Sequence, residues 1–223
     1  MFIGHLGVGL AFKKLDRRLN TAWLMAAALF SDLLLWTLVL LGFERVHIPA
    51  NFVESHFLTF DFPYSHSLVA SLVWSILFYL VVTMLARNAD HRRATIIAVA
   101  VFSHFLCDFV VHIPELPVLD NSSTKLGLGL WRHMELTLLL ELGILVVGLI
   151  LYLRSTCAAT SAGKYGMILF MSVLAILAFV GTLSGPKPNS GSQVALSSLI
   201  TQIIILILAY WLDTKRSGLK TEA

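Results

Sequence analysis

Long apolar runs separated by short polar clusters dominate this sequence. A helix needs about 20 apolar residues to cross the hydrocarbon core of a bilayer, and six stretches reach or approach that length. They are residues 21–42, 63–86, 94–113, 136–153, 165–184 and 193–212. Prolines and glycines within residues 184–192 forbid a continuous helix there, so the last two stretches form a hairpin. The pattern predicts an all-α, polytopic membrane helix bundle with about six transmembrane helices.

The apolar segment 2–12 is too short to cross a membrane. A secretory signal carries its basic residues before the apolar run, whereas here the basic cluster 13–18 follows it. We therefore expect a short membrane-embedded helix, with His5 roughly 13 Å from Lys14 along its axis. Residues 1–223 are expected to form a single integral membrane domain, in which 154–223 is a C-terminal helical hairpin.

Composition excludes several other classes of protein. Apolar residues make up 57% of the chain and charged residues 13%, against roughly 45–50% and 25% in soluble domains. A disordered chain, a disulfide scaffold and a nucleic-acid-binding protein are therefore excluded. Membrane lipids are the partners that this composition implies.

Basic residues predict the orientation. If the first span starts in the cytoplasm, twelve basic residues fall inside and four outside, as the positive-inside rule requires. The inside set is Lys13, Lys14, Arg17, Arg18, Arg87, Arg92, Arg93, Arg154, Lys164, Lys215, Arg216 and Lys220, and the outside set is Arg45, Lys125, Arg132 and Lys187. We expect a multi-pass protein with its N- and C-terminal basic segments in the cytoplasm.

Ionisable side chains inside membrane spans are costly, and they usually face a bundle interior or a wet cavity. His104, Asp108 and His112 lie four residues apart in the third span, so a helix places them on one stripe. Imidazole suits zinc and related metals, and a carboxylate completes the charge balance. The stripe predicts a metal site, and a hydrogen-bonded cluster without metal is the alternative.

Other spans supply further polar groups. Asp32 lies near the middle of the first span, His66 just inside the second, and Glu141 in the fourth. With His5 they could line one cavity that opens outward. Each also has a simpler interpretation: a helix-packing contact for Asp32 and Glu141, an interfacial histidine for His66, and a buried core histidine for His5.

The loops outside the membrane carry aromatic residues and more histidines. The aromatic set of the first loop is Phe43, Phe52, Phe57, Phe60, Phe62 and Tyr64, and it suggests either an interfacial belt or a lid over the cavity. Asp61 and Pro63 look like the start of the second span. We expect His47, His56 and His91 to be solvated loop residues, and His133 and Glu135 to lie at the rim of the fourth span.

Several of these residues together resemble a known family, the membrane-bound metal-dependent hydrolases of bacteria, which include LexA-regulated inner-membrane proteins. The matching pieces are Gly4-His5, Ser31-Asp32, Tyr64-Ser65-His66-Ser67, Ser103-His104 with Asp108, His112-Ile113-Pro114 with Leu116-Pro117, Gly127-Leu128-Gly129-Leu130-Trp131, and Glu141-Leu142. The likeness covers residues 5–153, so residues 1–153 would form the metal-site half.

The resemblance implies an inner-membrane protein with a centre of histidines and aspartates and a hydrolytic activity. Family members carry a double aspartate in the first span and an HRxxTHS motif before the second. Here Leu33 follows the single Asp32, and Pro63-Tyr64-Ser65-His66-Ser67 stands in place of the longer motif. The missing aspartate favours one metal over two.

The leading hypothesis is a zinc-dependent hydrolase acting on a lipid or other amphiphile, plausibly a phosphoester, from the outer half of the membrane. His66, His104 and Asp108 would be the core metal ligands, joined by His112, Asp32 or His5, and Asp32 or Glu141 would serve as general base. A transporter of ions, protons or small molecules, a b-type haem protein using His66 and His104, and a scaffold whose polar groups only pack helices are the alternatives.

Overall fold

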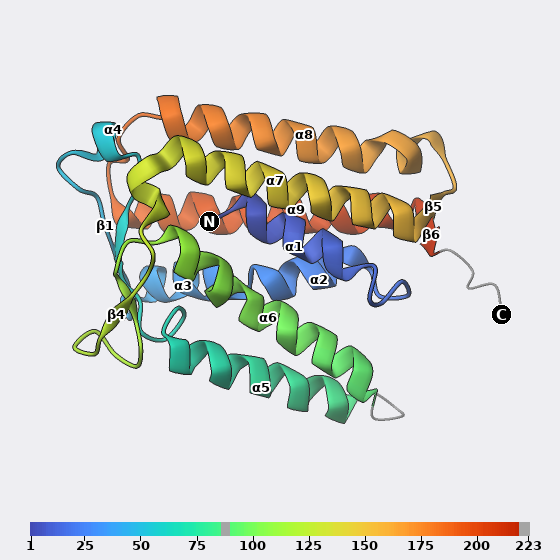
Figure 1. The fold of residues 1–223 in the computed structure, drawn as a ribbon, viewed down its shortest axis with the longest axis horizontal. Helices are drawn as coiled ribbons and strands as arrows, with labels where there is room; N and C mark the ends of the chain where they lie inside the picture. Colours follow the sequence, from blue (N-terminus) through green and yellow to red (C-terminus); the bar gives the residue numbers. More distant parts are fainter. Residues whose placement is uncertain (86–89, 219–223) are drawn as a thin grey trace.

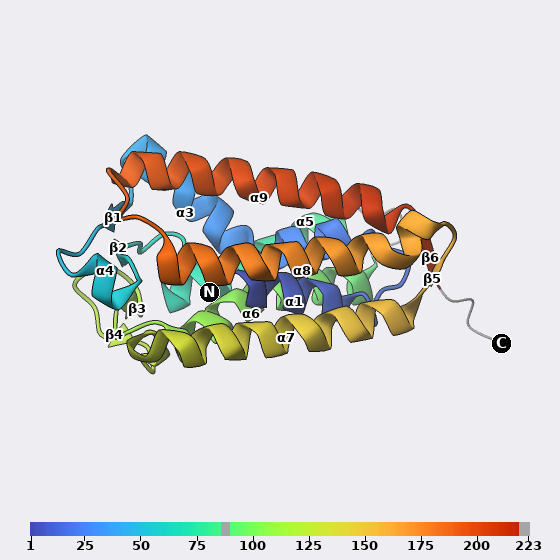
Figure 2. The ribbon, with the colours of Figure 1, turned by 90° about the horizontal axis from the view of Figure 1, so that it is seen from above.

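The computed structural model describes residues 1–85 and 90–218 and confirms the all-α class. Within these residues nine α-helices run beside one short 3-10 helix and three pairs of very short strands. The helices lie side by side along the long axis of the molecule (Figures 1 and 2). Ala86, Arg87 and Lys220, which entered the predicted second span and the charge count, lie outside the described residues.

Five helices are long and apolar enough to cross a membrane: α5 (Leu68–Leu85), α6 (His91–Val111), α7 (Met134–Ser155), α8 (Ser161–Ser184) and α9 (Gly191–Asp213). A sixth span results if the bent pair α2 (Thr21–Ala28) and α3 (Phe30–Leu41) counts as one. Several apolar helices thus indicate a multi-pass membrane protein, and the predicted number of about six spans is reached when the bent pair is counted as one span.

The first span is broken, which the sequence did not reveal. The axes of α2 and α3 differ by 58° at Leu29, although no proline or glycine lies between residues 21 and 41. The carbonyl of Ala28 accepts a hydrogen bond from His104 Nδ1 on α6 at 2.8 Å. A side chain that inserts into the ladder of helical hydrogen bonds is a known cause of kinks.

The second span begins later than predicted. Helix α5 starts at Leu68 and not at Pro63, so Asp61 and Pro63 do not open it, and His66 precedes the helix. Ser67 caps the helix instead, since its hydroxyl accepts from the backbone of Ala70. The third span also starts earlier than expected, because Asp90 caps α6 through the Arg93 backbone amide.

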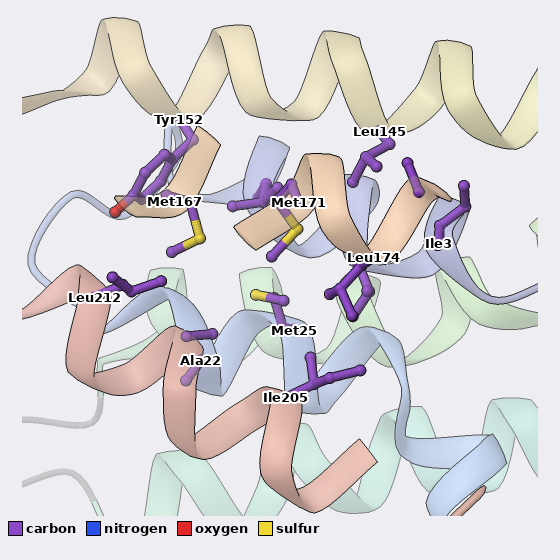
Figure 3. Close-up of a cluster of buried hydrophobic side chains, with 14 of the residues drawn as sticks. Ile3, Ala22, Met25, Leu145, Tyr152, Met167, Met171, Leu174, Ile205 and Leu212 are labelled. Atoms are coloured by element: carbon purple, nitrogen blue, oxygen red, sulfur yellow. The ribbon is translucent and has the colours of Figure 1, made fainter. Parts of the chain in front are cut away.

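Helix α1 (Ile3–Phe12) confirms the expected short apolar helix and lies inside the bundle. It packs against α7, α2 and α6 (Figure 1). Its apolar side chains join the largest buried cluster, in which Ile3 and Leu6 meet Leu145 of α7 and Met171 of α8 (Figure 3). The burial of α1 places His5 in the interior rather than at the surface.

The two ends of the bundle differ. One end, called here the loop end, carries β1 (Arg45–His47), α4 (Phe52–Ser55), β2 (Thr59–Asp61), β3 (Leu116–Pro117), β4 (Lys125–Leu126) and the 3-10 helix η1 (Leu130–His133). The strands pair antiparallel as β1–β2 and β3–β4. The opposite end carries the antiparallel pair β5 (Thr156–Ala158) and β6 (Arg216–Gly218) (Figure 2).

Candidate metal centre

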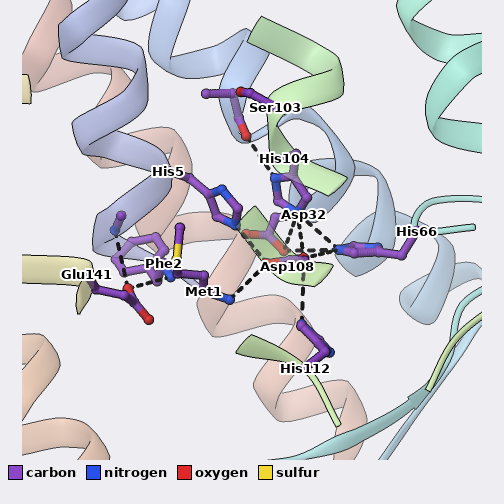
Figure 4. A network of polar contacts seen from close by, with 12 residues as sticks. Met1, Phe2, His5, Asp32, His66, Ser103, His104, Asp108, His112 and Glu141 are labelled. Carbon is purple, nitrogen blue, oxygen red and sulfur yellow. Dashed lines mark hydrogen bonds and ion pairs between the residues drawn. The ribbon is translucent and has the colours of Figure 1, made fainter. Parts of the chain in front are cut away.

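Helix α6 supplies the middle of a buried cluster of histidines and aspartates. His104 and Asp108 lie on its buried face, and His112 caps its C-terminal end just beyond Val111. The four-residue spacing brings His104 Nε2 to 3.1 Å and His112 Nε2 to 3.6 Å from Asp108 Oδ2. The stripe expected from the sequence is therefore present, with Asp108 at its centre (Figure 4).

His66 reaches the same point from the segment before α5. Its Nε2 atom lies 3.1 Å from His104 Nε2 and 3.5 Å from Asp108 Oδ2. The Oδ1 atom of Asp32 lies 3.6 Å and 3.7 Å from the Nε2 atoms of His66 and His104. Asp32, His66 and His104 thus place three potential ligand atoms within 4.8 Å of one another, and Asp108 lies against both histidines.

The Nδ1 atoms of three histidines are already engaged. His104 Nδ1 donates to the Ala28 carbonyl, and His112 Nδ1 donates to Glu115 Oε1 at 2.8 Å. His66 Nδ1 lies 2.7 Å from the Ser65 hydroxyl, which itself donates to Glu44 Oε2 and so accepts from the imidazole. Each neutral ring then carries its proton on Nδ1 and presents an unprotonated Nε2 to the cluster.

This arrangement is typical of metal-ligating histidines, whose second nitrogen donates to a carbonyl, hydroxyl or carboxylate. Two Nε2 lone pairs that face one another at 3.1 Å repel unless a cation lies between them. Ligands at 2.0–2.1 Å from a tetrahedral zinc ion are about 3.3 Å from one another, and the five separations given above are 3.1–3.7 Å. The buried His and Asp groups are therefore able to hold a metal ion.

The break in the first span positions Asp32. Because α3 begins at Phe30, Asp32 falls in the first turn of a new helix, where a carboxylate is favoured by the helix dipole. Its side chain is 15% exposed, whereas that of Asp108 is 1% exposed. Asp32 is thus the more accessible of the two carboxylates.

A buried glutamate holds the segment that carries His66. Glu44 accepts hydrogen bonds from the backbone amides of Tyr64 and Ser65 and from the Ser65 hydroxyl. Burial raises the pKa of the Glu44 carboxyl, against the hydrogen bonds from Ser65 and Tyr64 that lower it. These contacts keep residues 64–66 in a turn, which explains why His66 precedes the helix.

His5 and Met1 reach the other oxygen of Asp108. His5 Nε2 and the α-amino nitrogen of Met1 lie 3.1 Å and 3.2 Å from Asp108 Oδ1. The ring of His5 stacks on that of His104 with 3.8 Å between centroids, but its buried Nδ1 has no hydrogen-bond partner among the described residues. His5 therefore lies at the centre but lacks the outer contact that orients the other three rings.

Glu141 lies beside the cluster and caps α1. Its Oε2 accepts from the backbone amides of Phe2 and Gly4 at 2.8 and 3.2 Å (Figure 4). A carboxylate at a helix N-terminus satisfies amides that have no partner within the helix. The contacts that the structure shows for Glu141 thus hold α1 in place.

A cavity of about 490 Å³ adjoins the centre on the loop end. Asp32, His66, His112 and Glu141 lie on its wall. The aromatic residues that line it are Phe2, Trp36, Phe52, Phe57, Phe60, Phe62 and Trp131. Four of the six aromatic residues singled out in the first loop thus cover the cavity, whereas Phe43 and Tyr64 are exposed elsewhere.

The C-terminal hairpin also contributes to this cavity. The polar residues of α9 that line it are Ser197, Ser198, Thr201 and Gln202. Gln202 is buried, and its Oε1 atom has no hydrogen-bond partner among the described residues. In the sequence, these residues form a row of polar side chains on one face of an otherwise apolar span. They were not among the site residues expected from the sequence.

Three further residues of the site were not expected there. Glu115 follows His112 by three residues and orients its ring, a spacing that could have indicated the contact. Trp131 packs on His112 with 3.8 Å between ring centroids. Glu44 had no local signal, because its partners lie about twenty residues away in the chain.

The remaining histidines behave differently from one another. His47 is exposed and pairs with Asp61, and His133 and Glu135 are exposed beside the start of α7. His56 follows α4 in a loop and is half-buried, and it also lines the cavity, which was not expected. His91 is the first residue of α6 and contacts the Tyr79 hydroxyl, so it does not lie in a loop.

Comparisons with protein-family models, curated proteins and solved structures found no match to this chain. Any functional assignment therefore depends on the geometry of the centre and its cavity.

Proposed function

We propose that this protein is a metal-dependent hydrolase of the bacterial inner membrane. The observation that carries the proposal is the arrangement of His66 and His104, whose Nε2 atoms face one another at 3.1 Å with both Nδ1 atoms already bound. His66, His104 and Asp108 are the core ligands, joined by His112 or His5, and Asp32 lies beside them. Histidines and carboxylates of this kind suit zinc.

The cavity supports an amphiphilic substrate. Its aromatic wall fits an apolar chain, and the row of hydroxyls and the amide on α9 fits a polar group. A divalent ion held by the histidines supplies Lewis acidity toward an ester or phosphoester oxygen. Such a substrate would enter from the membrane, so lipids are the class to test first.

Asp32 is the proposed general base, with Glu141 as the alternative. Asp32 lies on the cavity wall within 3.7 Å of both core histidines, where a carboxylate can accept the proton of an attacking water. Oε2 of Glu141 is occupied by two backbone amides. The same two contacts make Glu141 the residue that holds α1, and with it His5, against the centre.

The positions of the basic residues support an orientation of the protein in the membrane. The basic residues of the α1–α2 loop and of the α6 and α9 ends lie opposite the loop end, so we assign them to the cytoplasm. The centre and its cavity then face the periplasmic side.

Metal analysis tests the proposal. We expect about one zinc per chain in the purified wild-type protein, loss of the metal in His104→Ala, and full occupancy in the control His47→Ala, whose exposed ring pairs with Asp61. Metal-free wild-type protein of undiminished stability would overturn the proposal.

The hydrolase assignment needs a separate measurement. Incubation with bacterial lipid extract, followed by mass spectrometry, should show products that are absent with His104→Ala and with Asp32→Asn. Zinc flux into proteoliposomes that Asp32→Asn abolishes, without any hydrolysis product, would assign the centre to a transporter instead.

A further inference from the structure

A second cavity, of about 990 Å³, lies at the end of the bundle opposite the loop end. The α1–α2 loop, the start of α6 and the end of α9 enclose it. Its lining residues include Lys13, Lys14, Asp16, Arg17, Arg18, Asp90, Arg92, Arg93, Asp213 and Arg216. Nothing in the proposed hydrolase mechanism uses this cavity, which we call the basic cavity.

The side chains that line the basic cavity carry more positive than negative charge. Seven of the lining residues are basic and three are acidic. The three acids already have partners within the fold. Asp16 pairs with Arg93 and Asp213 with Lys13, each at 2.9 Å, and Asp90 caps α6 and lies 3.7 Å from Arg93.

Five of the seven basic side chains have no carboxylate partner within the part of the chain that the structure describes. One of them, Arg216, donates to the Thr156 hydroxyl and to backbone carbonyls instead. The other four are Lys14, Arg17, Arg18 and Arg92, on the α1–α2 loop and at the start of α6. Arg92 donates to the Leu15 carbonyl, which holds the start of α6 to the α1–α2 loop. Lys14, Arg18 and Arg92 are exposed and can turn toward a bound anion.

Excess positive charge at helix ends alone would only indicate the cytoplasmic side. Here the basic residues line a single cavity that is large enough for a small molecule. The positive-inside bias requires basic residues at the cytoplasmic helix ends, but it does not require them to gather around a cavity. Arginine and lysine in such numbers favour phosphate, because guanidinium groups bind its oxygens in pairs and ammonium groups add charge.

The position of the cavity identifies the source of the phosphate. It lies where α1 and α9 end and α6 begins, at the end of the bundle that the proposed orientation puts at the cytoplasmic surface, and Ile96, one turn into α6, adds an apolar contact at its wall. Basic pockets between transmembrane helices on the cytoplasmic side suit anionic headgroups. We propose that the basic cavity binds the phosphate headgroup of an anionic phospholipid.

The test compares two variants of equal charge. Lys14→Gln/Arg18→Gln removes two cavity charges that have no side-chain partner among the described residues, so folding should survive. Arg154→Gln/Lys164→Gln removes two charges at the same end of the bundle but outside the cavity. Native mass spectrometry counts the lipid that each protein retains from nanodiscs of mixed phosphatidylglycerol and phosphatidylcholine, and a parallel titration uses inorganic pyrophosphate.

We expect the wild-type protein to retain phosphatidylglycerol over phosphatidylcholine. The cavity variant should lose this preference by about tenfold or more, at roughly 1 kcal/mol per basic residue. The control variant should keep it. Equal losses of the lipid preference in both variants would show that the preference comes from general surface charge and not from the cavity. Binding of pyrophosphate without any lipid preference would show that the ligand is a soluble phosphate compound and not a lipid. Either result overturns the proposal.

Discussion

Gly7 of α1 lies directly against Gly148 of α7. A Cβ atom added to Gly148 would overlap the carbonyl oxygen of Gly7, and one added to Gly7 would lie 2.6 Å from the Cα atom of Leu145. Small residues let membrane helices approach this closely. The contact sets how deeply α1 sits in the bundle, and therefore where His5 meets Asp108.

Gly148→Ala should destabilise the protein. The methyl group meets backbone rather than a movable side chain, and overpacking of this kind costs about 1–3 kcal/mol. Gly143→Ala is the matched control, because nothing lies within 4 Å of a Cβ at Gly143 on the same helix. Thermal unfolding in detergent compares the two, and equal melting temperatures would contradict the close packing of α1 on α7.

Glu115→Gln should weaken metal binding without abolishing it. The Glu115 carboxylate accepts from His112 Nδ1, and loss of such an outer contact costs about 10–100-fold in metal affinity. Glu54→Gln, on the exposed face of α4, should leave the affinity unchanged. Competition with a zinc chelator measures both. An unchanged affinity in Glu115→Gln would remove His112 from the metal centre.

The sequence predicted the architecture well, because the length of an apolar run and the charges that flank it are local properties. The stripe of His104, Asp108 and His112 was predictable for the same reason, since one helix sets its spacing. These features need no knowledge of which helices are neighbours.

The rest depends on contacts between distant parts of the chain. The break at Leu29 coincides with a hydrogen bond from His104 to Ala28, 76 residues away in sequence. The late start of α5 depends on Glu44, and the position of Gln202 on the cavity wall depends on how α9 packs against α3. No local pattern around these residues encodes those contacts.

Asp16 should give the protein an acid-sensitive contact at the basic cavity. Burial raises the pKa of its carboxyl, but hydrogen bonds from Arg93 and from the backbone of Arg18 and Leu19 outweigh burial and lower the pKa below the ordinary 3.8. A lowered folded-state pKa gives stability that is complete above 3.8 and is lost as the pH falls through the lower value.

Asp16→Asn should therefore lower the melting temperature at pH 7 by about 2–4 °C, as expected for a partly exposed ion pair worth up to about 1 kcal/mol. The difference from the wild-type protein should shrink as the pH falls below 3.8. Unfolding scans at several pH values measure it. A difference that stays constant down to the acid limit would show that the charge of Asp16 does not contribute.

Gln202→Leu should make the protein more stable. The Oε1 atom of Gln202 is buried without a donor among the described residues, and an unpaired buried acceptor costs about 1–3 kcal/mol. Leucine fills a similar volume without that cost, so the melting temperature should rise by at least about 2 °C. Gln193→Leu, at the exposed start of the same helix, should change it little.

The gain in stability should be accompanied by a loss of function. A side chain kept at such a cost on the wall of the cavity is suited to accept a hydrogen bond from a hydroxyl or amide group of a bound molecule. Gln202→Leu should therefore keep its zinc but lose turnover of any lipid that the wild-type protein hydrolyses. A variant that is less stable than the wild-type protein would show that the amide already has a partner in the fold.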